Sequence, residues 1–88
     1  MHAVVVRVTV SDREGATKRL REEVVPQVSS APGFQAGYWT SGEGDSGLSM
    51  VIFDSEENAR AAADRVPSTI PEDVSLEGVE VREVVASA

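Results

Sequence analysis

Hydrophobic and polar positions alternate in four segments of this chain, which predicts four β-strands. Valine occupies every second position of Val4–Val10, and Val79–Val85 alternates in a similar way. The segments Phe34–Thr40 and Leu48–Phe53 are rich in aromatic and branched residues and lie on either side of a glycine-rich loop. Two such segments around a short loop are typical of a β-hairpin.

Two further segments, Thr17–Val28 and Ala59–Val66, have the spacing of apolar residues that is typical of helices. A capping box that starts at Ser11 is predicted to begin the first helix. Its apolar stripe repeats every four residues: Ala16, Leu20, Val24 and Val28. The stripe of the second helix is mostly alanine, which allows close approach to a sheet: Ala59, Ala62, Ala63 and Val66. The segment Pro67–Gly78 is predicted to be a connection to the last strand.

The order β-α-β-β-α-β predicts an α+β fold, a ferredoxin-like sandwich whose four-stranded antiparallel sheet carries both helices on one face. The valine side of Val4–Val10 is expected to face the helices. If alternation holds along every strand, the other face carries Arg7, Thr9, Trp39 and Phe53. That face is uncovered in a monomer, and such a surface usually marks an interface or a ligand cleft. Two copies packed face to face would close a dimeric α/β barrel.

Length and charge restrict the classes of partner. The 88 residues are expected to form one domain, residues 1–88, and a monomer of this size is marginally stable. The chain has no cysteine, so disulfides cannot supply the missing stability, and a homodimer or a higher oligomer is expected. The net charge of −7 argues against binding to nucleic acid or to an anionic membrane. No apolar stretch or leader is recognised, so a cytoplasmic protein is expected.

The residues Gly42–Gly47 match the letters of a dinucleotide-binding fingerprint, but a strand follows them where that site requires a helix. We therefore interpret them as a hairpin loop. Glu43 and Asp45 provide too few oxygens for a calcium site. His2 is the only histidine, and a frayed terminal position is expected for it. Without cysteine or a second imidazole no zinc or haem-ligand set can be assembled, so the sequence predicts no metal and no cofactor.

The residues most suited to a pocket are aromatic, with an arginine and hydroxyl groups near them on the predicted strands. Aromatic rings supply flat apolar walls, and a guanidinium holds a carboxylate or an enolate oxygen. The competing interpretation makes Trp39 an anchor of the dimer interface and pairs Arg7 with Glu80 or Glu83. The candidates for a pocket or a dimer interface are Arg7, Thr9, Tyr38, Trp39, Ser49 and Phe53.

Two stretches, Pro32–Trp39 (Pro-Gly-Phe-Gln-Ala-Gly-Tyr-Trp) and Gly47–Ala59, resemble the dimeric α/β-barrel superfamily. Their sequence is similar to its antibiotic-biosynthesis-monooxygenase-like branch, which includes small uncharacterised members. The resemblance extends over nearly the whole chain. It implies a homodimer whose sheets face each other, and it implies a family that includes cofactorless monooxygenases of polycyclic phenols and haem-degrading enzymes.

The signature residues of those enzymes are replaced here. Haem-degrading members use an asparagine on the first strand, a tryptophan that ends the third strand and a histidine beyond it. The resemblance places Phe53 and Ala63 at the last two positions, and Val4–Val10 contains no asparagine. The cofactorless oxygenases have another asparagine where this chain has Ser49, whose hydroxyl is a poor base. The resemblance therefore implies the fold more strongly than the chemistry.

Three functions remain open. The first is a homodimeric binding or structural module without catalysis. The second is a cofactor-independent monooxygenase-like enzyme that acts on a small aromatic metabolite, with Trp39, Tyr38 and Arg7 lining its pocket. The third is a small-molecule sensor of the amino-acid-binding, ferredoxin-like kind. A small aromatic or apolar ligand is compatible with all three.

Overall fold

The structure, a computed structural model, describes residues 1–70 and 74–88 and contains one antiparallel sheet. Its strands are β1 (His2–Val10), β2 (Phe34–Ser41), β3 (Ser46–Phe53) and β4 (Val74–Glu83). The four strands lie in the order β2-β3-β1-β4, and every neighbouring pair is antiparallel. This is the order of a ferredoxin-like sandwich, so the predicted fold class is confirmed.

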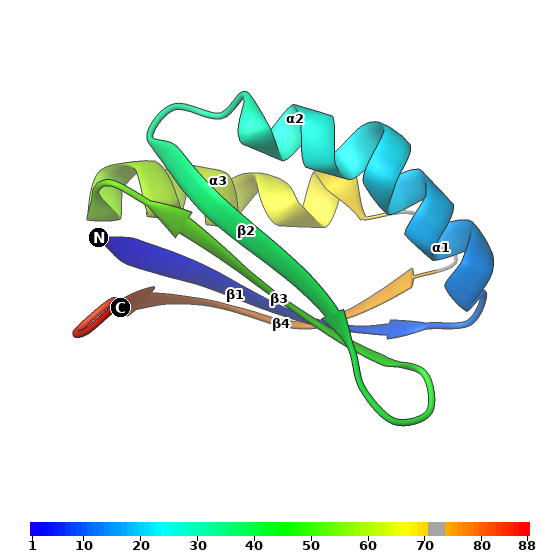
Figure 1. Ribbon diagram of the computed structural model, residues 1–88. Coiled ribbons are helices and arrows are strands. Elements are labelled where there is room, and N and C mark those ends of the chain that lie inside the picture. Colours follow the sequence, from blue (N-terminus) through cyan, green and yellow to red (C-terminus); the bar gives the residue numbers. More distant parts are fainter. Residues whose placement is uncertain (71–73) are drawn as a thin grey trace.

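The helices lie together on one face of the sheet (Figure 1). The first helical segment consists of α1 (Arg13–Arg19), a π-helical turn η1 (Leu20–Val24) and α2 (Val25–Ser29). The second is α3 (Glu56–Thr69), which runs beside it over the same face. Figure 1 shows no element over the other face of the sheet. The sheet therefore has a helix face and an open face.

The π-helical turn explains why the stripe of the first helix repeats every four residues. A regular α-helix has 3.6 residues per turn, so residues four apart drift around it by about 40° at each step. In η1 the amide of Val25 donates to the carbonyl of Leu20, five residues back, and this wider turn reduces the drift. Pro26 follows directly, and its ring would collide with the carbonyl four residues back in a regular helix. The wide turn keeps Ala16, Leu20, Val24 and Val28 on the inner side.

Several predicted boundaries differ from the structure. The first helix is capped by Asp12, whose carboxylate accepts from the amide of Gly15, and the predicted cap at Ser11 is wrong. The helix α3 continues through Pro67 into the segment predicted to be a connection, and hydroxyls of Ser68 and Thr69 bond carbonyls of the preceding turn. The strand β4 begins at Val74, well before the predicted start. Residues 71–73 of the predicted connection lie outside the described residues.

The core lies between the sheet and the helices, as the valine pattern predicts. Its fully buried members come from β1, β3 and α3: Val4, Val6, Val51, Phe53 and Ala59. Phe53 is 1% exposed and packs edge to face on Phe34, with ring centroids 6.4 Å apart. The expectation that Phe53 lies on the open face is wrong, because its partner on β1 is His2, which shares the valine side of that strand.

Trp39 also lies on the helix face, so the expectation that it lies on the open face is wrong. The pairing of β2 with β3 shifts between Phe34 and Ala36, which marks a β-bulge. Beyond the bulge, Trp39 pairs with Ser49, whose partner on β1 is the core residue Val6. The bulge places Phe34 on the same face as Trp39, although they are an odd number of positions apart. Sequence alternation alone separates these two rings.

Candidate functional site

The structure divides the six candidate residues between the two faces of the sheet. Trp39, Ser49 and Phe53 lie on the helix face, and Phe53 is part of the core. The remaining three, Arg7, Thr9 and Tyr38, lie on the open face. The candidates therefore do not form one site, and a pocket built from Trp39, Tyr38 and Arg7 together is incompatible with this fold.

A cavity of about 350 Å³ lies on the helix face, between the α1–η1 segment and the sheet. We call it the outer cavity. Its floor consists of side chains from β1, β2 and β3, including Val8, Trp39 and Ser49, and its wall on the helix side includes Leu20 and Val24. Ligand pockets in proteins typically have volumes of about 300–1,000 Å³ and mostly apolar walls. The outer cavity meets both criteria, so it is the candidate site.

A second, smaller space of about 140 Å³ lies deeper, between α2 and α3 above the sheet. We call it the inner cavity. Its lining includes the core residues Val4, Val51 and Phe53, and the alanine-rich face of α3 contributes Ala62. The two cavities share part of their walls: Val6, Val24, Trp39, Ser49, Thr69 and Ile70. They are therefore adjacent compartments of one apolar region.

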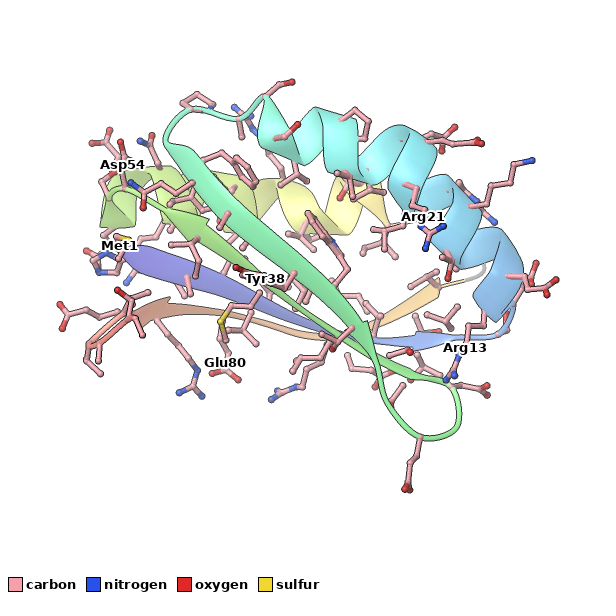
Figure 2. All side chains as sticks on the ribbon, viewed as in Figure 1. Met1, Arg13, Arg21, Tyr38, Asp54 and Glu80 are labelled. Atoms are coloured by element: carbon pink, nitrogen blue, oxygen red, sulfur yellow. The ribbon has the colours of Figure 1, made fainter. Side chains whose placement is uncertain are left out.

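Arginines supply all the formal charge that the described residues place around the outer cavity. Three of them, Arg13, Arg19 and Arg21, line it, and none of the described aspartates or glutamates does so. Figure 2 shows Arg21 on the side of the helical segment that faces the sheet. The whole chain has a net charge of −7, so this concentration of cations is opposite in sign to the protein as a whole. It favours an anionic group at the rim.

Arg13 also holds the hairpin loop against the start of the first helix. Its guanidinium donates to the carbonyl of Gly42 at 3.1 Å and to the carbonyl of Gly44. The loop is tied to β1 as well, because the amide of Val10 donates to the carbonyl of Asp45 at 2.7 Å. The glycine-rich segment is thus a hairpin loop beside the cavity, as predicted, and its backbone carbonyls engage one of the three arginines.

The chemistry available in the outer cavity is that of binding. Among the described residues that line it, arginine is the only titratable type, so the lining contains no carboxylate or imidazole that could act as a general base. Hydroxyl groups such as those of Ser49 and Thr17 are the other polar side chains there. Within residues 1–70 and 74–88, no three histidine, cysteine, aspartate or glutamate side chains come together as a metal site.

The sequence patterns did not indicate the three arginines. Arg19 lies outside the apolar stripe of the first helix, yet it is half-buried at the cavity. The π-helical turn changes the phase of the helix after Arg19, so a regular helical wheel misplaces the residues on either side of it.

His2 lies in β1, so the expectation of a frayed terminal position is wrong. Its Nε2 atom is 3.8 Å from the carboxylate of Glu56, and its Nδ1 atom is buried without a hydrogen-bond partner among the described residues. It does not line either cavity.

The open face combines exposed apolar side chains with a row of charges. Tyr38 is 64% exposed and pairs across the strands with Met50, which is 41% exposed. On the neighbouring strands Arg7 forms an ion pair with Glu80 at 3.2 Å, which confirms one of its two predicted partners. Figure 2 shows Glu80 on the side of the sheet away from the helices. This face has the composition of a surface that packs against another surface.

No protein-family model matches the sequence, and no curated protein matches it either. Solved structures do match. A variant of MhuD with two manganese protoporphyrin IX molecules bound per active site aligns with a TM-score of 0.63 and 15% identity, over 100% of this chain and 98% of the other. The haem degrader MhuD from Mycobacterium tuberculosis, with two haems in its active site, aligns with a TM-score of 0.50 and 18% identity, over 97% and 98% of the two chains. This chain therefore has the ferredoxin-like fold of MhuD, as its resemblance to the monooxygenase-like branch predicts.

Proposed function

We propose that this protein binds a small planar aromatic molecule with an anionic group in the outer cavity. The observation that carries the proposal is an apolar cavity of about 350 Å³ whose described charged residues are all arginines. Aromatic rings would lie against Trp39 and the valines of β1, where burial of apolar surface is favourable. The anionic group would lie at the rim near Arg21, since a guanidinium matches a carboxylate in shape and charge.

The described residues of the outer cavity offer no side chain that could coordinate the iron of haem. The only histidine, His2, lies outside both cavities, and no cysteine exists in the chain. The described lining of the outer cavity contains no tyrosine or lysine that could serve instead. Although MhuD is a haem degrader, the residues of this chain support a metal-free aromatic ligand.

A direct test uses 1-naphthoate as the probe, because it has two fused rings and one carboxylate. Trp39 is the only tryptophan, so its indole N–H gives a single cross-peak in a ¹H–¹⁵N spectrum and reports on the cavity alone. We expect this peak to shift and saturate as 1-naphthoate is added, with calorimetry giving the affinity. An indole peak that stays in place, together with no heat of binding, would contradict the proposal.

The role of the arginines is tested by the variant Arg21→Gln. We expect it to weaken 1-naphthoate by about tenfold, because one charge-assisted hydrogen bond is lost, and to leave the neutral analogue 1-naphthalenemethanol unchanged. The matched control is Arg60→Gln, which removes a cation from α3 that pairs with Glu56 outside both cavities. An equal loss for both ligands in Arg21→Gln would assign that residue a structural role.

The second candidate is a cofactor-independent monooxygenase that acts on such a ligand. The fold shared with MhuD favours it over a purely structural module. In this reaction a phenol would take up O₂, one oxygen atom becoming a quinone oxygen and the other leaving as water. Arg21 would hold the phenolate during the reaction. Oxygen uptake with 1-naphthol above that of the buffer would support this candidate, and binding without uptake would leave the ligand-binding function alone.

We also propose that the protein forms a homodimer through its open face. Tyr38, Leu48 and Met50 are large apolar side chains that remain at least 41% exposed there, and no described helix covers them. Burial of these side chains against a second copy would supply stability that a chain of 88 residues lacks by itself. Tyr38 and Met50 line neither cavity, whereas Leu48 also lines the outer cavity, so the proposed interface and the ligand site meet only at Leu48.

A further inference from the structure

Two polar side chains in the floor of the outer cavity, those of Trp39 and Ser49, have no hydrogen-bond partner among the described residues. The two residues pair directly across β2 and β3, so their side chains lie next to each other on the helix face. Of the described side-chain atoms, only Nδ1 of His2 is both buried and unpartnered. The indole N–H and the Ser49 hydroxyl therefore keep accessible surface, which a ligand in the cavity can contact.

The other hydroxyl groups in the described lining of the outer cavity are either engaged or exposed. Ser41 is exposed at the end of β2, where water can bond to it. Ser49 is half-buried, and its partner on β1 is the core residue Val6. The remaining hydroxyls already donate to backbone carbonyls, and they belong to Thr17, Thr40, Ser46 and Thr69. Ser49 is thus the half-buried hydroxyl of this lining that is available to a ligand.

The packing of the indole ring of Trp39 leaves its N–H available as well. The atoms of the ring that contact Gly37 are Cη2 and Cζ3, which would lie 2.8 and 2.9 Å from an added β-carbon. Both atoms belong to the far edge of the six-membered ring, whereas the N–H belongs to the five-membered ring. The contact with Gly37 therefore holds the ring in place without covering the N–H.

We propose that Trp39 and Ser49 form an oxygen-binding subsite in the floor of the outer cavity. The inference rests on the proposed function and adds a substrate class to it: aromatic carboxylates with a phenolic hydroxyl or a ring carbonyl remote from the carboxylate. The carboxylate lies at the rim near Arg21, on the helical segment, and the second oxygen lies on the sheet side. A few polar groups in a mostly apolar pocket typically fix the orientation of its ligand.

The donors and acceptors of the pair favour a hydroxyl group over other substituents of similar size. An indole N–H only donates, whereas a serine hydroxyl both donates and accepts. A phenolic oxygen accepts from Trp39 and gives its own proton to Ser49, so both protein groups are satisfied. A methoxy group has no proton for Ser49, and an aromatic amino group is a poor acceptor for the indole N–H. A hydroxyl should therefore bind more tightly than either of them.

The experiment compares 1-naphthoate with 5-hydroxy-1-naphthoate, 6-hydroxy-1-naphthoate and 7-hydroxy-1-naphthoate in calorimetric titrations. We expect at least one hydroxy isomer to bind the wild-type protein about tenfold more tightly than 1-naphthoate, because it gains two hydrogen bonds. Amino and methoxy groups at the same ring position should gain less than about threefold. The indole proton of Trp39 should also lie further downfield with that isomer than with 1-naphthoate, because its N–H is then hydrogen-bonded.

Two variants each remove one member of the subsite. Trp39→Phe keeps an aromatic ring and loses the N–H, and Ser49→Ala loses the hydroxyl. The ratio of the affinities for the hydroxy isomer and for 1-naphthoate is compared within each variant, so a general loss of apolar contact cancels. We expect this ratio to fall from about ten to less than about three in both variants. The matched control is Ser68→Ala, which removes a hydroxyl of α3 outside both cavities and should keep the full ratio.

The outcomes separate this inference from the proposed function. If neither 1-naphthoate nor any hydroxy isomer binds, both proposals fail. If 1-naphthoate binds and no hydroxy isomer binds more tightly, only the oxygen subsite is overturned. It is also overturned if the gain persists in both Trp39→Phe and Ser49→Ala, or if Ser41→Ala abolishes the gain and Ser49→Ala does not. Should a variant fail to fold, the wild-type protein still decides, because equal gains from hydroxy, amino and methoxy groups would contradict hydrogen bonding by this pair.

Discussion

The indole ring of Trp39 lies over Gly37, and a β-carbon at Gly37 would be 2.8 Å from its Cη2 atom. The glycine therefore creates the space that the tryptophan fills on the helix face of β2. This contact connects the bulge near Phe34, which sets the face of the strand, with the wall of the outer cavity. A substitution at either residue should therefore change the packing of the other.

The variant Gly37→Ala should displace the indole ring. Its methyl group would occupy the position of the ring, so we expect a loss of about 1–3 kcal/mol in the free energy of unfolding, as in other overpacked cores. The emission maximum of Trp39 should shift at the same time. Urea denaturation and fluorescence spectra measure the two effects. Gly44→Ala is the control: it has φ of +64° and no atom within 4 Å of the added β-carbon, so it should cost stability without moving the emission.

Dimer formation should depend on Tyr38 and Met50, which pair across β2 and β3 on the open face. We expect size-exclusion chromatography with light scattering to give twice the chain mass for the wild-type protein and the chain mass for Tyr38→Asp or Met50→Glu. A buried charge without a partner is strongly unfavourable at an interface. Ala61→Glu, on the exposed side of α3, should leave the dimer intact. A wild-type protein of single-chain mass would contradict the proposed homodimer.

The substitution Arg7→Ala should have a small effect on stability and none on ligand binding. Arg7 pairs with Glu80 at 3.2 Å, but its side chain is 57% exposed on the face opposite the cavities. Exposed ion pairs contribute about 0–1 kcal/mol. We expect denaturant unfolding to change by no more than that amount and the affinity for 1-naphthoate to stay the same. A marked loss of 1-naphthoate binding would indicate that the open face takes part in the ligand site.

The substitution Ser55→Ala should weaken the start of α3. The hydroxyl of Ser55 accepts from the amide of Asn58 at 3.2 Å and caps the helix. Loss of such a cap costs about 1 kcal/mol, which corresponds to a decrease of about 4–8 °C in the melting temperature of a domain this size. Replacement by aspartate, which also caps helices, should restore most of the loss. A full loss in Ser55→Asp would mean that the cap is not the cause.

The candidate site was only partly predictable from the sequence. Trp39 and Ser49 were candidates, and both lie on the wall of the outer cavity. Arg7 and Tyr38 were candidates by residue type, but they lie on the other face. The arginines at the cavity were not predicted, because Arg21 follows the start of a π-helical turn whose extra width no regular repeat describes.

The sequence by itself determined the order of the elements and the fold class. Alternation of valine in β1 and the apolar stripes of the helices each depend on neighbours a few positions away, so local periodicity was sufficient to find them. It also determined the glycine-rich hairpin loop, whose surroundings exclude a dinucleotide site. The alternation of valine also predicts which side of β1 is buried, because four valines share that side of the strand.

Only the tertiary structure decided which face Trp39 and Phe53 occupy. The shift in pairing between Phe34 and Ala36 moves one residue of β2 out of register, and such a bulge depends on the partner strand rather than on the strand's own sequence. Phe53 joins the core because β3 pairs with the valine side of β1 at that point. A strand has a repeat of two residues, so one displaced position exchanges its faces, and the cavity wall was decided by that single displacement.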